Sequence, residues 1–250
     1  MFTGACSLKH APVAVDPLQW RKIDSHEKEE SLIKKLDSIN FGLAQFKGKG
    51  KLYVYKKGKL NLAERLFWIC AAPNLVRLSV VALSGMPLAS FASDGKWFYI
   101  RSHTDDYFSK KPLTTANLDT IISVPVSATD IIFILSGRVA AIPHTTATFY
   151  QSNSEQDYMA VFNNDRKKMV ARVYFDPLVA RVMRIERLDS KGRVQYEVTF
   201  SGHRTMGGYQ VPYDIVVQNG AQDRAHLKVL SYWPHPSISD SVFSLQKTVQ

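Results

Sequence analysis

An alternation of apolar and polar residues with a period of two is the feature that most constrains the fold. Over residues 193–200, Val194, Tyr196, Val198 and Phe200 alternate strictly with polar residues. Because successive side chains of a β-strand point to opposite faces, this pattern indicates a strand with one buried and one solvated face. Less regular runs of the same kind occupy 50–56, 61–71, 75–83, 88–93, 96–101, 169–175, 179–188, 211–218 and 226–233. The sequence therefore predicts about ten strands.

Short turn signals separate these runs. Each is a dipeptide that ends in glycine, and glycine supplies the positive φ that tight hairpin turns need. They are Lys57-Gly58, Ser84-Gly85, Asp94-Gly95, Lys191-Gly192, Gly207-Gly208 and Asn219-Gly220. Hairpins in series predict an antiparallel meander, and a sheet of this width has to curl. We therefore expect a mainly β protein of the α+β class with one strongly curved sheet.

Two segments have the periodicity of helices. From Ser25 the apolar residues Leu32, Ile33, Leu36 and Ile39 form the stripe of one amphipathic helix that ends near Ser38. The second segment interrupts the meander and contains a short helix over 117–122 and an apolar helix over 131–135. A helix that is apolar nearly all round has to be covered, and the concave face of a curled sheet is the expected cover.

The ends of the apolar helix also have sequence signals. Ser127 and Asp130 have the spacing of a capping box at its start, and Ser136-Gly137 is a stop signal at its end. Residues 144–168 are polar and lack a period, so we expect a long loop with a short edge strand there.

The sequence contains none of the motifs that would indicate catalysis. It has no G-x-S-x-G elbow, no P-loop and no G-x-G-x-x-G, and its histidines are never spaced at i, i+3 or i+4 as paired metal ligands on a helix would be. We therefore expect no enzyme activity, no catalytic residue, no metal and no cofactor.

The net charge of +10 raises nucleic acid and anionic membranes as partners. Much of the excess lies in one cluster of lysines at positions 47, 49, 51, 56, 57 and 59. No nucleic-acid-binding motif accompanies the cluster, so nucleic acid is not an expected partner. Two interpretations remain open: a solvated strand face on which lysine discourages edge pairing, or a surface that is attracted to anionic head groups.

The predicted strands and helices contain a surplus of apolar and aromatic residues. They either form a plain core or enclose an apolar slot that a ligand fills. No apolar run is long enough to span a bilayer as a helix. The residues expected to line the slot and its helical cover are Trp68, Phe91, Trp97, Ile121, Ile122, Ile132, Leu135, Val198 and Phe200.

The two cysteines have different surroundings. Cys70 follows an aromatic-rich run and is expected to be a buried small hydrophobe. Cys6 follows Thr3, Gly4 and Ala5, and small residues before a cysteine near the start are typical of a bacterial lipoprotein, although leucine is preferred where Thr3 stands. Lipidation of Cys6 remains open on this local sequence. Residues 1–24 would then form the anchor and tether of a single folded domain over residues 25–250.

The order of these elements, and five stretches of sequence, resemble the LolA/LolB family of lipoprotein carriers. The stretch "FKGKGKLYVYKKGKLNLAERLFWICAAPNLVRLSV" is similar to the family's opening strands, through Phe46, Gly48, Gly50, Pro73 and Arg77. "NLDTIISVPVSATDIIFILSGRV" resembles the stretch that holds the family's lid helices. The hairpin "GMPLASFASDGKWFYI" and the closing stretches "GRVQYEVTFSGHRTMGGYQVPYDIVVQ" and "HLKVLSYWPHPSISDSVFSL" are also similar. The resemblance covers roughly residues 26–246.

The resemblance implies an unclosed β-barrel with an N-terminal helix and a two-helix lid on the concave face. It implies a monomer that binds acyl chains or lipoproteins in an apolar cavity and helps to localise them to the outer membrane. LolB-like members are themselves lipoproteins, which suits Cys6, and they carry a loop that dips into the bilayer. The matching residues are Leu83, Met86 and Leu88, where an ordinary hairpin turn is the alternative.

Three partners follow from the resemblance: lipid or lipoprotein acyl chains, the periplasmic face of the outer membrane, and a periplasmic LolA-type carrier as donor. A structural or interaction lipoprotein of the same fold, whose own side chains fill the cavity, is the alternative from another functional class.

Overall fold

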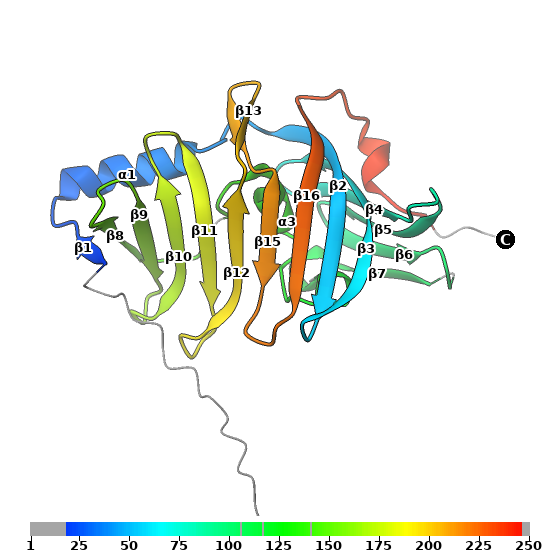
Figure 1. The fold of residues 1–250 in the computed structure, drawn as a ribbon, viewed down its shortest axis with the longest axis horizontal. Helices are drawn as coiled ribbons and strands as arrows, with labels where there is room; N and C mark the ends of the chain where they lie inside the picture. The colour runs from blue at the N-terminus through cyan, green and yellow to red at the C-terminus, as the bar shows by residue number, and fades with distance from the viewer. Residues whose placement is uncertain (1–18, 106, 117, 141, 247–250) are drawn as a thin grey trace, which may run out of the picture.

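The computed structural model describes residues 19–105, 107–116, 118–140 and 142–246, without the side chains of Thr120 and Ile121. One antiparallel sheet of 14 strands dominates these residues, in the order β1-β8-β9-β10-β11-β12-β15-β16-β2-β3-β4-β5-β6-β7. The edge strands β1 and β7 do not pair with each other, so the sheet is unclosed (Figure 1).

The chain forms the sheet in two meanders. The first contains β2 (Gln45–Lys56), β3 (Lys59–Ala71), β4 (Leu75–Val81), β5 (Pro87–Asp94), β6 (Trp97–Ser102) and β7 (Phe108–Pro112). The second contains β8 (Thr146–Ser152), β9 (Tyr158–Asn163), β10 (Met169–Asp176), β11 (Arg181–Leu188), β12 (Val194–Ser201), β15 (Asp214–Gln218) and β16 (Arg224–Pro234). The long strands β16 and β2 pair from Arg224 and Tyr55 to Pro234 and Phe46, and this pairing joins the two meanders.

The remaining elements are short, apart from one helix. Strand β1 (Trp20–Lys22) pairs with β8, and β13 (Arg204–Met206) and β14 (Tyr209–Val211) form a separate hairpin. The helices are α1 (His26–Ser38), α2 (Asp119–Ile122) and α3 (Ile131–Ser136), with 3-10 turns at η1 (Leu113–Thr115) and η2 (Asp240–Phe243).

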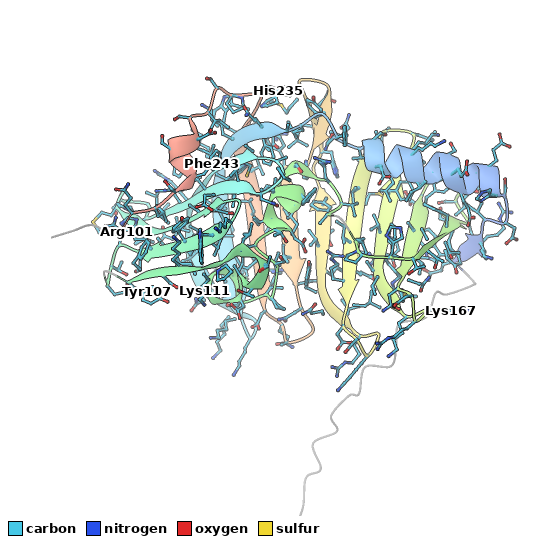
Figure 2. All side chains as sticks on the ribbon, turned by 180° about the vertical axis from the view of Figure 1, so that it is seen from behind. Arg101, Tyr107, Lys111, Lys167, His235 and Phe243 are labelled. Carbon is cyan, nitrogen blue, oxygen red and sulfur yellow. The ribbon has the colours of Figure 1, made fainter. Side chains whose placement is uncertain are left out.

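The helices α1, α2 and α3 lie on one face of the sheet, which we call the inner face. Figure 1 shows α1 and α3 behind the sheet, and Figure 2 shows the same helices in front. Leu32 and Leu36 of α1 and Ile132 and Leu135 of α3 share one core cluster with inward-facing strand residues such as Phe46. The opposite surface is called the outer face below.

The expected N-terminal helix is confirmed. Helix α1 begins at His26, after Ser25, whose hydroxyl accepts a hydrogen bond of 3.4 Å from the Lys28 amide. The mainly β class and the single large antiparallel sheet are also as expected.

Three local expectations are wrong. Residues 144–168 form the strands β8 and β9. The period is missing in β9 because both of its faces are buried: Ala160 and Phe162 lie in the main core, and Met159 and Val161 pack with Tyr174 on the outer face. The short strand β7, over residues 108–112, was also not anticipated. The count of about ten strands is therefore too low.

The third error is the capping box. Asp130 precedes α3 but makes no side-chain capping hydrogen bond, and the Ser127 hydroxyl bonds to the backbone and hydroxyl of Thr129. The stop signal is confirmed, because Gly137 has a φ of +66° and ends the helix in the left-handed region.

One close approach explains a glycine in β2. Gly48 lies directly across from Trp68 of β3, and a β-carbon at Gly48 would overlap the indole ring. Trp68 is 1% exposed, and its ring also lies near that of Tyr232, with the ring centres 6.3 Å apart and the planes tilted by 57°.

We therefore expect Gly48→Ala to lower the free energy of unfolding by about 1–3 kcal/mol, because the added methyl overpacks a filled site. Chemical denaturation followed by fluorescence measures this. Gly220→Ala is the matched control, because a β-carbon there meets no atom within 4 Å. Equal stability of the two variants would contradict the packing described for Trp68.

Candidate functional site

The inner face encloses an apolar cavity beneath the lid, which we define as residues 118–136, comprising α2, α3 and the segment between them. Its volume is about 50 Å³, and its lining is entirely apolar. The sheet contributes Leu52, Leu66, Leu78, Val80, Phe91, Ile215, Val217, Ala225 and Leu227. The lid contributes Leu118, Ile122, Ile131, Ile134 and Leu135.

The alternation of the strands places these residues together. Strands β2 and β16 are neighbours, and their inward residues Leu52 and Leu227 are direct partners across the pair. Leu66 and Val80 are opposed in the same way on β3 and β4. Each strand therefore adds one or two apolar side chains to a continuous floor, and the lid rests on that floor.

A polar latch holds the start of α3 to the sheet. The Asp130 carboxylate accepts hydrogen bonds from the Tyr196 hydroxyl at 2.9 Å and from the Arg187 guanidinium at 3.3 Å. Arg187 is on β11 and Tyr196 on β12, so the latch joins the lid to two adjacent strands. The side chains of Arg187 and Asp130 are only 18% and 13% exposed, which makes this ion pair the lid's main electrostatic contact.

Burial and charge act together on the latch. Burial raises the pKa of Tyr196, and the negative charge of Asp130 raises it further, so the phenol stays protonated and donates to the carboxylate. Burial alone would lower the pKa of Arg187, but the interactions with Tyr196 and Asp130 outweigh it and raise the pKa. Tyr196 and Arg187 therefore both stay protonated, as their hydrogen bonds to Asp130 require.

Asn40 holds the other end of α3. Its side-chain amide donates to the Ser136 carbonyl at 2.9 Å, and its side-chain oxygen accepts from the Gln210 amide at 3.0 Å. Asn40 is 7% exposed and has a φ of +52°, which asparagine tolerates better than most residues. Helix α3 is thus hydrogen-bonded to its surroundings at both ends, while Ile134 and Leu135 between them line the apolar cavity.

A cleft of about 590 Å³ with mixed polar and apolar walls adjoins the latch, and we call it the polar cleft to distinguish it from the apolar cavity. Its lining includes the latch residues Asp130, Arg187 and Tyr196, together with Thr114, Thr115, Ser127, Asn164 and Gln195. A smaller void of about 10 Å³ also touches the latch and reaches Ile134, which lines the apolar cavity. The latch therefore stands at the boundary between a polar cleft and an apolar interior.

The residues predicted to line the slot have different positions in the structure. Phe91, Ile122 and Leu135 line the apolar cavity, and Val198 lines the small void beside it. Trp68, Ile132 and Phe200 are in the surrounding core, outside the linings of these two voids. The Ile121 side chain lies outside the described residues.

The prediction that Trp97 lines the slot is wrong. It lies on the outer face, where the Lys110 ammonium is 4.5 Å from the ring centre, because the inward positions of β6 are taken by Phe98 and Ile100. In a run of consecutive aromatic residues, the sequence alone does not show which ones face inward, because that depends on the register of the strand with its neighbours.

The predicted membrane loop lies at the turn between β4 and β5. Leu83 and Met86 are each 62% exposed, whereas Leu88 is half-buried against the core. The Leu83 amide donates to the Glu64 carboxylate at 3.1 Å, which holds the loop beside β3. Cys6, the predicted lipid-attachment residue, lies outside the described residues.

Other site chemistries have little support in the part of the chain that the structure describes. There, no group of three or more His, Cys, Asp or Glu side chains is placed to hold a metal ion. Among the same residues, no helix has the length and apolarity that a bilayer crossing requires. Burial raises the pKa of the Cys70 thiol well above its usual value, so Cys70 is an inert core residue as expected.

Comparison with known proteins identifies the fold. No protein-family model and no curated protein sequence matches this chain. A LolA superfamily protein from Nitrosomonas europaea aligns with a TM-score of 0.57 and 10% identity, over 86% of this chain and 97% of that one. This chain has a LolA-like fold.

Two further solved structures show the same fold. A DUF1329 family protein from Desulfovibrio piger has a TM-score of 0.57 at 8% identity, over 86% of this chain and 93% of its own. A domain assigned to outer membrane lipoprotein sorting, from Vibrio parahaemolyticus, has a TM-score of 0.54 at 8% identity, over 87% of this chain and 94% of its own. These identities are low, so the likeness concerns the fold.

The latch predicts a specific effect of Asp130→Ala. Without the carboxylate, Arg187 stays largely buried with no charge partner, so we expect a loss of about 3 kcal/mol of unfolding free energy and faster amide exchange in α3. Denaturation and hydrogen exchange measure the two effects. Asp24→Ala removes the exposed ion pair with Lys22 and is the control, expected to leave both measurements nearly unchanged. Similar losses in both variants would contradict the latch.

Proposed function

We propose that this protein binds the acyl chains of lipids or lipoproteins between its lid and the inner face of the sheet. The observation that carries the proposal is a wholly apolar cavity under a lid whose helix α3 is held by polar contacts at both of its ends. The LolA superfamily and lipoprotein-sorting structures support it through their common fold. The same cavity offers no nucleophile or acid–base pair, so we propose binding and handover without catalysis.

Binding requires the lid to move. A cavity of about 50 Å³ has room for a few water molecules, whereas pockets for small organic ligands usually measure about 300–1,000 Å³. Displacement of α3 would uncover the floor formed by residues such as Leu52, Phe91 and Leu227. An acyl chain would cover it again, at about 0.8 kcal/mol for each methylene buried. Transfer from a donor would be driven only by the difference in apolar contact between the two proteins.

The polar cleft makes an amphipathic ligand the best fit. Its hydroxyl and amide side chains, such as Thr114, Thr115 and Gln195, lie next to the latch that borders the apolar interior. A polar head group would lie there while its acyl chain occupies the space under the lid.

The cellular setting is part of the same proposal. We propose that Cys6 carries a lipid anchor, that residues 1–24 act as a tether, and that the protein functions as a monomer at the periplasmic face of the outer membrane. Exposed Leu83 and Met86 would contact the bilayer, and a LolA-type carrier would be the donor. These features correspond to LolB-like members of the family.

A structural role is the second candidate, and the small cavity is the observation that favours it. If the lid never leaves the sheet, Ile134, Leu135 and their neighbours fill the slot permanently. The protein would then be a structural lipoprotein in an envelope assembly.

A fluorescent fatty acyl probe distinguishes the two candidates. The acyl-binding function predicts saturable binding by the 250-residue chain. It also predicts an affinity about tenfold lower for Leu135→Trp, because the larger side chain occupies the volume that the ligand needs.

Leu178→Trp is the control, because Leu178 is 80% exposed on the turn between β10 and β11. Absence of probe binding to the unchanged protein would favour the structural role. Equal affinity of the unchanged protein and Leu135→Trp would show that the probe binds elsewhere.

A further inference from the structure

Five cationic side chains form a stripe on the outer face. Strand β2 alternates strictly: Phe46, Gly48, Gly50 and Leu52 face the core, and the residues between them are exposed. These residues between them are lysines, and exposed cations of β3 and β16 continue the stripe to either side. The stripe consists of Lys47, Lys49, Lys51, Arg65 and Lys228.

The register brings like charges directly opposite each other. Lys51 pairs with Lys228 on β16 and with Arg65 on β3, so three cations form one row across three strands. Opposed like charges destabilise a sheet by a few tenths of a kcal/mol or more per pair. Within the described residues, no carboxylate lies within 4.0 Å of any cation in the stripe.

The nearest acidic residue by register is engaged elsewhere. Asp214 of β15 lies opposite Lys228, but its carboxylate is 2.9 Å from His226 Nε2 on the same side of β16. The stripe therefore presents positive charge to solvent without an internal counter-ion, which is a cost to folding that an external anion would remove.

Exposed apolar side chains alternate with the cations. Phe67 is opposite Lys49 and 38% exposed, and Trp233 is opposite Lys47 and 44% exposed. The Lys47 ammonium is 5.8 Å from the Trp233 ring centre. Leu230 of β16, at the bulge between Val229 and Ser231, is 53% exposed. Indole rings combined with lysines are typical of surfaces that meet the head-group layer of a bilayer.

The chain covers its outer face on both sides of the stripe. Toward one edge, η2 packs on β4 and β5 and buries Phe243, which Figure 2 labels, and Arg77 donates to the Ser244 carbonyl at 3.4 Å. Toward the other edge, Trp20 packs edge-on against Tyr174. Among the described residues, the strands between these two covers include β16 and β2, which face outward with no element over them (Figure 1).

We propose that the stripe docks the protein on a membrane surface rich in anionic phospholipid head groups. Each lysine or arginine near such a surface contributes about 1 kcal/mol of attraction, and Trp233 and Phe67 would lie at the head-group level. The lid faces the opposite side, so docking leaves it free to open toward an incoming donor.

The stripe also adjoins the exposed β4–β5 turn. Arg65 of the stripe pairs with Val81, the last residue of β4, so the turn that holds Leu83 and Met86 begins beside one end of the stripe. This inference goes beyond acyl binding, because it does not depend on the cavity.

The test is sedimentation of the 250-residue chain with vesicles of phosphatidylcholine, with or without about one third phosphatidylglycerol. The variant carries Lys49→Gln, Lys51→Gln and Lys228→Gln. We expect its partition onto the anionic vesicles to fall on the order of 100-fold at low salt, with little change on neutral vesicles. The control carries Lys34→Gln, Lys35→Gln and Lys191→Gln, three exposed lysines away from the stripe with the same change in net charge.

Equal losses in the two triple variants would overturn the proposal, since net charge alone would then explain binding. Unchanged vesicle binding by the stripe variant would also overturn it. If the unchanged protein binds a single-stranded oligonucleotide more tightly than it binds anionic vesicles, and the stripe variant loses that binding, the surface would be assigned to nucleic acid. A second readout locates the contact: brominated phospholipid should quench tryptophan fluorescence in the unchanged protein and less in Trp233→Phe.

Binding of the fluorescent acyl probe tests the proposed function independently of membrane docking by the stripe. The stripe variant should bind the probe as well as the unchanged protein does. If the protein docks on anionic vesicles but binds no probe, the stripe assignment holds and the acyl-binding function is contradicted. If it binds the probe but does not dock on anionic vesicles, the acyl-binding function holds and the stripe assignment is contradicted.

Discussion

The structure depends on covering one apolar face of a sheet that does not close. A fully closed barrel buries its interior with its own strands, but here β1 and β7 end the sheet without meeting. The inner face therefore needs another layer. Helix α1 covers the part formed by the second meander, and the short lid covers the part where β16 and β2 join the two meanders. When the cover of an open sheet can move away, the apolar face beneath it becomes available to an apolar ligand.

The lid combines two kinds of contact with different consequences. Its apolar side chains bury area without directional preference, so a ligand of the same character can replace them. The two ends of α3 are held by directed bonds, at Asp130 with Arg187 and Tyr196 and at Ser136 with Asn40. Opening would break these polar contacts, but Asp130, Arg187 and Tyr196 line a cleft of about 590 Å³ where water or a head group can satisfy them.

The sequence predicts those features that depend on local pattern. The strict alternation over 193–200, the glycine turns and the capped α1 specify the class, the meander and the first helix, because each is set by neighbouring residues. Strand β9 was missed because burial on both faces removes the period-two pattern. Trp97 was misplaced because register, which decides the face, depends on pairing with β5 and β7.

The latch was not predictable from the sequence for a related reason. Asp130 is 57 residues from Arg187 and 66 from Tyr196, and its position before an apolar helix has a simpler local explanation as a cap. The outer-face stripe was predictable only in part. The alternating lysines of β2 are visible in the sequence, whereas Arg65 and Lys228 join them only through the sheet register. Long-range polar pairs need the fold before they can be recognised.

Hydrogen exchange of residues 131–136 at saturating acyl ligand tests the central claim most directly. If the ligand replaces the lid on the inner face, the α3 amides should exchange faster in the complex, while the amides of β2 and β16 remain protected. Unchanged or slower exchange in α3, with the ligand bound, would contradict the account and show that the lid stays in place.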